Sequence, residues 1–127
     1  MRGRLFLSVA LLVSFLAIAV PVFAHHGTAN YDTTRMITVS GVATGFEFVN
    51  PHVQIYWDAK DDSGATEKWQ GELTSPNHLE RAGWTKSSIK SGDAIAISGY
   101  PTKSGAHEIW IQKVVISGKE LPTASGN

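Results

Sequence analysis

Hydrophobic and polar residues alternate in several short stretches after residue 35, a pattern that predicts a protein built mainly of β-strands. The clearest pair is His52–Lys60 and Thr66–Thr74, joined by the turn sequence Asp61-Asp-Ser-Gly64. If Trp57 faces Trp69 across this hairpin, Val53 faces Leu73 and Ile55 faces Gly71, which gives one apolar face, and the other face pairs polar residues. A shift by one residue would place charges in the core, so the pattern predicts this register.

The strand before this hairpin changes its inward face partway along. In Ile37–Val39 the odd-numbered positions are apolar, but beyond Gly41 the apolar positions become Val42, Phe46 and Phe48. Such a change predicts a β-bulge at the glycine, where one extra residue bends the strand. Long, bent first strands are typical of small barrels.

A short helix and two more strands complete the predicted domain. Ser75 followed by Pro76 is typical of a helix start, and Gly83 marks its end. Two strands follow, Ala94–Tyr100 and one from Ala106 to about Ser117. The order β-β-β-α-β-β predicts a mostly β, five-stranded OB-like barrel with one helix between strands three and four. An open five-stranded sheet with a helix across it has the same order and is the alternative.

The first 24 residues have the three-part order of a secretory signal peptide. The basic start Met1–Arg4 precedes an apolar run, Leu5–Val20, and Pro21 breaks this run just before Ala24. We expect cleavage after Ala24 and a mature chain that starts at His25 in the periplasm. An uncleaved membrane anchor is the alternative, because the apolar stretch is just long enough to cross a bilayer. After cleavage no stable membrane span is expected.

Three segments are expected in the mature chain: a polar arm at 25–34, the OB-like domain at 35–117 and a frayed tail at 118–127. The mature chain has nine Lys and Arg residues and eleven Asp and Glu residues, so its net charge is −2. Its basic residues form no continuous stripe along the sequence. Nucleic acid is therefore not an expected partner. Because the chain has no cysteine, disulfides and thiolate metal sites are excluded, and stability must come from the core or a ligand.

The predicted mature start, His25-His26, suggests a metal site. An N-terminal histidine can chelate a metal through its free amine and its ring Nδ1, and a further imidazole completes a nitrogen-ligated site. Nitrogen ligands without sulfur favour copper over zinc and nickel. His52 or His107 supplies the third ligand if the arm folds back, with Glu72 as a further candidate; a disordered start is the alternative.

The outward face of the second and third strands is a second candidate site. In OB-folds this face binds ligands, and here it carries Gln54, Tyr56, Gln70 and Glu72 beside His52. It is suited to binding a protein or a glycan without metal, although polar residues are also ordinary on a solvated strand face. Trp110 lies on the opposite face of its predicted strand from Ile109 and Ile111, and it is expected to face a partner.

Several fragments together resemble a known family: His25-His-Gly27, Asn50-Pro-His52, Trp69-Gln-Gly-Glu-Leu73 and Gly83-Trp84. They are similar to an uncharacterised family of small exported bacterial proteins, known only as a domain of unknown function. The resemblance implies export and a β-rich domain but no established activity. It singles out the motif positions His25, His26, Asn50, His52 and Glu72.

The expected function is therefore an exported periplasmic binding module that holds a transition metal, copper favoured. A metal-free adaptor for a periplasmic protein or small ligand is the alternative, and an oxidative copper enzyme is a weaker one. No Gly-x-Ser-x-Gly or His-Glu-x-x-His motif is present, and Ser75 is interpreted as a helix cap rather than a nucleophile. The sequence thus favours binding over catalysis.

Overall fold

The computed structural model describes residues 27–123. The predicted signal peptide, His25, His26 and residues 124–127 lie outside the described residues. After a 3₁₀ turn at Thr28–Asn30, the elements are β1 (Ile37–Glu47), β2 (Gln54–Lys60), β3 (Thr66–Glu72), α2 (Pro76–Arg81), β4 (Ala94–Pro101), β5 (Glu108–Ile116) and β6 (Lys119–Leu121).

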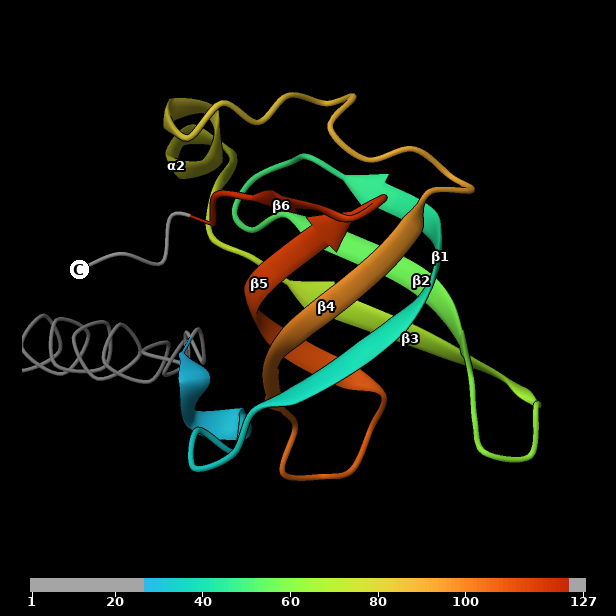
Figure 1. Ribbon diagram of the computed structural model, residues 1–127. Coiled ribbons are helices and arrows are strands. Elements are labelled where there is room, and N and C mark those ends of the chain that lie inside the picture. The colour runs from blue at the N-terminus through green and yellow to red at the C-terminus, as the bar shows by residue number, and fades with distance from the viewer. Residues whose placement is uncertain (1–26, 124–127) are drawn as a thin grey trace, which may run out of the picture.

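Five of the strands close into a barrel (Figure 1). β1 pairs with both β2 and β4, β2 pairs with β3, and β4 pairs with β5, all antiparallel. A short parallel pairing of β3 with β5 joins the two ends of this sheet. The prediction of an OB-like barrel with a helix between strands three and four is confirmed, and the open-sheet alternative is excluded.

The register of the β2–β3 hairpin is the predicted one. Trp57 lies opposite Trp69, and Ile55 lies opposite Gly71 on the inward face. On the outward face Tyr56 lies opposite Gln70, and Gln54 lies opposite Glu72. The alternation of apolar and polar residues explains this agreement, because a shift by one residue would bury charge.

The bulge in β1 lies further along the strand than predicted. The inward face runs from Ile37 through Gly41 to Ala43, and the register with β2 shifts between Ala43 and Gly45. Thr44 is therefore the extra residue. The prediction that Val42 faces inward is wrong: its side chain is 48% exposed, whereas Ala43 is buried.

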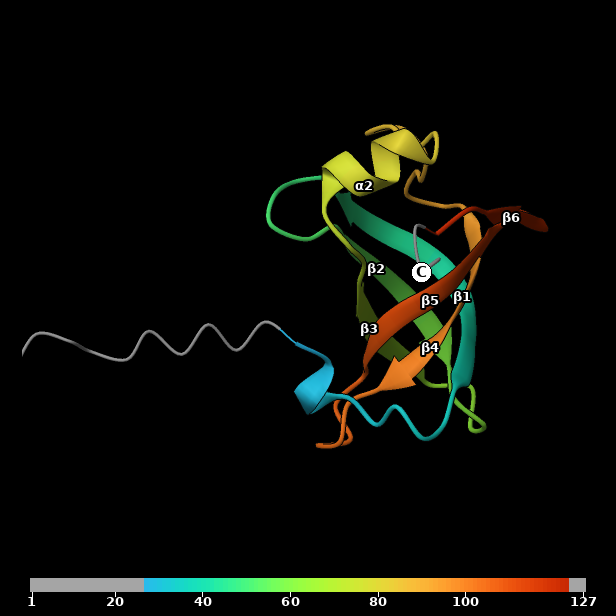
Figure 2. The ribbon, with the colours of Figure 1, turned by 90° about the vertical axis from the view of Figure 1, so that its left-hand side faces the viewer.

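Apolar residues from all five barrel strands fill the interior, with Trp57, Ile97 and Ile109 fully buried near its centre. The helix α2 covers one end of the barrel, where Leu79 is fully buried (Figures 1 and 2). Trp84 is buried and belongs to the same core. Its indole nitrogen donates to a backbone carbonyl just beyond β6, at a distance of 2.8 Å.

The segment after residue 117 differs from the predicted frayed tail. Lys119–Leu121 form β6, which pairs antiparallel with the end of β5 after a turn at Ser117-Gly118. Leu121 packs against the core, and the hydroxyl of Thr123 donates to the carbonyl of Gln112. Between residues 27 and 123, no helix is long and apolar enough to cross a membrane.

Candidate functional site

The barrel closure brings acidic side chains from two distant strands together on the outward face. In the parallel pairing, Gln70 lies beside Glu108 and Glu72 lies beside Trp110. All four residues lie at outward-facing positions of their strands, since burial alternates along β3 and β5 and the intervening Gly71 and Ile109 are buried. Glu72 and Glu108 therefore lie on one face. Figure 2 shows the N-terminal arm beside β3 and β5.

His52 and Glu72 form a half-buried pair on this face. The two residues precede and end neighbouring strands of the hairpin, and Nδ1 of His52 hydrogen-bonds to Oε1 of Glu72. The side chains are 26% and 20% exposed. The edge of the imidazole also meets the ring of Trp110, at 5.9 Å between centroids. With its Nδ1–H donated to the carboxylate, a neutral His52 carries its ring lone pair on Nε2.

Tyr31 anchors the N-terminal arm to the same carboxylates. Its hydroxyl donates to Oε1 of Glu108 at 2.6 Å and lies 3.5 Å from Oε2 of Glu72. Its ring is buried against Trp110, with the centroids 5.8 Å apart. Burial, and then the hydrogen bond to Glu108, raises the pKa of Tyr31 far above its ordinary value. The hydroxyl is thus a proton donor at every physiological pH.

The raised pKa of Tyr31 predicts a loss of stability in alkali. A tyrosine whose pKa is higher in the folded chain stabilises the fold fully below the unfolded pKa, and this contribution disappears as pH rises past that value. Between pH about 9 and about 11, the free energy of unfolding should therefore fall. Chemical denaturation across this range should give a shallower fall in Tyr31→Phe. An equal fall in both proteins would contradict the assignment.

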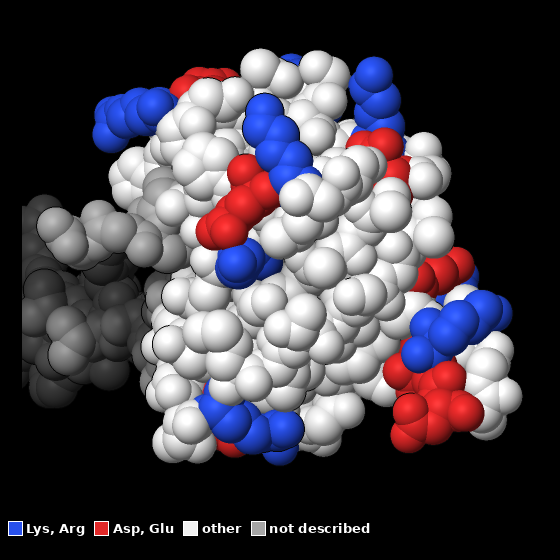
Figure 3. Space-filling view, in the orientation of Figure 1, with Lys and Arg blue, Asp and Glu red and all other residues white. Residues whose placement is uncertain are grey.

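The cluster of His52, Glu72, Tyr31 and Glu108 holds two carboxylates, while Lys68 and Lys103 line the pockets beside Glu108. Among the ion pairs of residues 27–123, none joins Glu72 or Glu108 to a lysine or arginine. Figure 3 shows Lys and Arg interspersed with Asp and Glu on the face that it draws, with no continuous basic stripe there. The local chemistry suits a cation better than an anion.

The other sequence-predicted metal ligands are placed differently. His107 stacks on Trp69 with ring centroids 4.6 Å apart, and its Nε2 lies 3.6 Å from a carboxylate oxygen of Glu67. It therefore has partners of its own and does not join the His52 pair. His25 and His26 lie outside the described residues. Within residues 27–123, no three His, Cys, Asp or Glu side chains are arranged to hold a metal ion.

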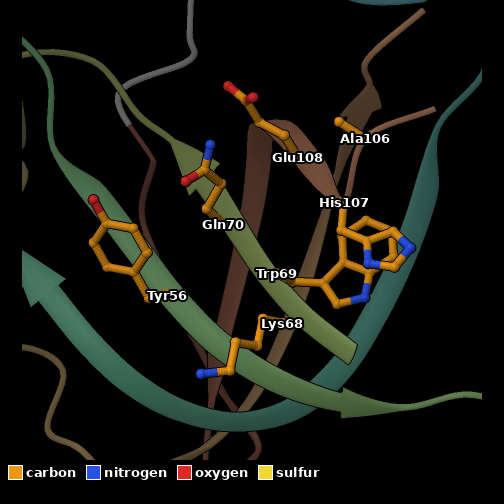
Figure 4. A pocket seen from close by; sticks show the side chains of 7 residues that line it. All are labelled: Tyr56, Lys68, Trp69, Gln70, Ala106, His107 and Glu108. Carbon is orange, nitrogen blue, oxygen red and sulfur yellow. The ribbon is translucent and has the colours of Figure 1, made fainter. Parts of the chain in front are cut away.

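The predicted outward row lies beside a shallow cavity of about 380 Å³ (Figure 4). Tyr56 and Gln70 line it, together with Glu108 and the Trp69–His107 stack. The Tyr56 hydroxyl donates to Glu47 at 3.3 Å. Gln54 is half-buried opposite Glu72, and the predicted binding residue Asn50 is exposed in the β1–β2 loop.

Two residues of the cluster were missed as site residues by sequence reasoning. Glu108 has the outward parity of Trp110, but only the β3–β5 pairing places it near Glu72. Tyr31 lies in a polar segment without periodicity, which predicts no buried position. Trp110 was expected to face a partner; the structure places Tyr31 of the same chain against it. His78 is exposed on α2, and its Nδ1 lies 3.1 Å from the hydroxyl oxygen of Thr74.

Comparison with known proteins assigns a family and a fold. No curated protein sequence matches this chain significantly. Among solved structures, the mitochondrial single-stranded DNA-binding protein Rim1 of S. cerevisiae is similar at a TM-score of 0.50 and 6% identity, over 65% of this chain and 93% of that chain. At this identity the likeness shows the fold alone. The expectation of an uncharacterised family is confirmed by a match over residues 12–109. The chain therefore belongs to the family of unknown function DUF6152.

Proposed function

We propose that the mature protein is an exported periplasmic binding module that holds a transition-metal ion, with copper favoured. Its ligands are the amine and ring of His25, with His26 beside it, and the imidazole of His52. Storage or delivery of copper is the role that such a site supports. No step of catalysis is included in this proposal.

One observation carries the proposal: the arm that follows the N-terminal histidines is anchored at the His52–Glu72 pair. His26 precedes Tyr31 by five residues, a length of chain that spans at most about 18 Å. Tyr31 itself lies 3.5 Å from the carboxylate that binds His52. A processed N-terminus is therefore tethered within reach of the His52 ring.

The chemistry of the pair supports a metal ligand. Histidines that bind metals usually donate their second ring nitrogen to a carboxylate, which fixes the tautomer and makes the ligand more basic. Glu72 stands in this relation to His52. We therefore assign Glu72 as the orienting partner rather than a direct ligand. Glu108 adds a second negative charge nearby, and three nitrogen donors without sulfur favour Cu(II).

The experiment that tests the proposal compares two starts of the mature chain. A protein that begins at His25 is expected to bind one Cu(II), because its free amine and Nδ1 close a chelate ring. One alanine added before His25 removes that amine from the chelate and is expected to weaken binding by about a hundredfold or more. Isothermal titration with a competing chelator measures both affinities. Equal affinities would overturn the proposal.

A metal-free adaptor remains the second candidate, and the cavity beside Tyr56 and Gln70 favours it. An aromatic ring, an amide and a carboxylate around a shallow hollow suit a glycan or a peptide. Since the same face carries Glu47, Glu72 and Glu108, we do not propose nucleic acid as its ligand. If the protein is such an adaptor, its affinity for the glycan or peptide would not change with the added alanine but would decrease on substitution of Tyr56. These two results distinguish the adaptor from the metal-binding protein.

A further inference from the structure

We propose that the open edge of β3, at Thr66 and Lys68, binds an extended peptide as an added strand, with an acidic side chain of the peptide opposite Lys68. The inference goes beyond the proposed metal site and does not depend on copper. It also gives the second candidate function a definite class of ligand, a peptide rather than a glycan.

β3 is paired along its whole length on one side but only at its end on the other. On the first side, residues of β2 lie opposite every position from Thr66 to Glu72. On the second side, the parallel pairing with β5 begins at Gln70, whose backbone N–H donates to the carbonyl of His107 at 3.0 Å. No strand of residues 27–123 pairs with this side of β3 before Gln70. Figure 1 shows the β2–β3 turn projecting from the barrel at this open end.

The hydrogen bonds of β3 show which backbone groups this open edge carries. Along a strand, alternate residues direct their N–H and C=O groups to the same side. Gln70 directs its N–H away from β2, so Lys68 and Thr66 do the same, whereas the N–H of Leu73 donates to Val53 on the β2 side at 2.9 Å. Lys68 and Thr66 are also exposed. Their unpaired N–H and C=O groups therefore form a template for a further strand.

The side chains beside this edge favour a peptide that carries an acidic residue. Within residues 27–123, no ion pair joins Lys68 to a carboxylate. Lys68 lines the shallow cavity with Gln70, whose side-chain amide can both donate and accept hydrogen bonds (Figure 4). The Trp69–His107 stack lines the same cavity. Because successive residues of a strand point to opposite faces, an acidic residue would meet Lys68 while an apolar neighbour would meet the stack.

Backbone pairing is the property that distinguishes a peptide from a glycan at this edge. A chain of amides can offer one donor and one acceptor to the C=O and N–H groups of Lys68, as an added strand does. A sugar ring carries hydroxyl groups without that regular spacing. If backbone pairing holds the ligand, methylation of the peptide nitrogens is expected to weaken binding by about tenfold or more, because it removes donors and places methyl groups between the strands.

The experiment is an NMR titration of the metal-free mature protein with two peptides. The first probe is a capped peptide of alternating valine and threonine with one central aspartate. The second has the same side chains but carries N-methyl groups on its central residues, which removes backbone donors from both of its edges. Hydrogen exchange of the Lys68 amide reports pairing at the open edge. The Gln70 amide, which already donates to His107, is the internal control.

Two substitutions test the charge of the site. In Lys68→Glu, like charges would lie opposite each other, so the aspartate peptide is expected to bind about fivefold more weakly. Lys86→Glu is the matched control, because Lys86 is also exposed but lies between α2 and β4. This variant should bind the peptide as the unsubstituted protein does.

We expect the unmethylated peptide to shift the amide signals of Lys68 and His107. Exchange of the Lys68 amide should slow about tenfold when the free peptide exceeds its Kd tenfold, with no change at Gln70. The absence of any shift at millimolar peptide, or equal binding of the two peptides, would overturn the inference. Shifts caused by a linear oligosaccharide of glucose but not by the peptide would also overturn it, and would leave the adaptor as a glycan-binding protein.

Discussion

Replacing His52 by alanine is expected to weaken Cu(II) binding by the native-start protein about a hundredfold or more. The substitution removes the imidazole proposed as a ligand, together with its hydrogen bond to Glu72. Loss of a ligand should exceed the ten- to hundredfold cost of losing a partner that only orients one. Glu72→Gln should therefore have the smaller effect of the two.

The matched control is His78→Ala. His78 is also a histidine that accepts or donates one side-chain hydrogen bond, but it lies exposed on α2 beside Thr74. Competition titration should show unchanged affinity for this variant. If His52→Ala and His78→Ala had the same affinity as the unsubstituted protein, His52 would not be a ligand.

The second large effect concerns the close approach of two strands rather than the site. A Cβ at Gly99 would lie 2.2 Å from the carbonyl oxygen of Trp110 and 2.6 Å from a methyl carbon of Ile109. The first of these is backbone, so β4 and β5 would have to separate. Gly99→Ala is expected to lower the free energy of unfolding by about 3 kcal/mol, at the upper end of overpacking effects.

Urea denaturation measures this effect, with Gly27→Ala as its control. Gly27 has open space around its Cβ position and extended backbone, so its substitution should change the free energy of unfolding by less than about 0.5 kcal/mol. A Gly99→Ala protein as stable as the Gly27→Ala protein would show that β4 and β5 do not approach as described.

Strand register was predicted correctly from the sequence where one alternating pattern of apolar and polar residues runs through the whole segment. The β2–β3 register agrees with the alternation, because a shift by one residue would bring charged residues onto the apolar face. The bulge in β1 was misplaced because Gly41 was interpreted as the bulge. In the structure a Cβ at Gly41 would lie 2.0 Å from the carbonyl oxygen of Asp58, so this glycine permits close strand approach instead. β6 was missed because three residues are too few for a periodic signal.

The candidate site was predictable only in part, for a topological reason. His52 and Glu72 belong to one hairpin, so the outward alternation already placed them together. Glu108 joins them through the parallel pairing that closes the barrel, which no local pattern specifies. Tyr31 joins them through an arm whose polar sequence gives no sign of a buried aromatic. His107 is exposed in the loop before β5 and stacks on Trp69, so its partners are not those of His52.

The most direct test of the account is electron paramagnetic resonance of Cu(II) added to the mature protein with its native start at His25. The proposal predicts a stoichiometric copper signal with nitrogen ligation that changes in His25→Ala and in His52→Ala. Only the signal of loosely bound copper, or a nitrogen-ligated signal unchanged by both substitutions, would contradict it.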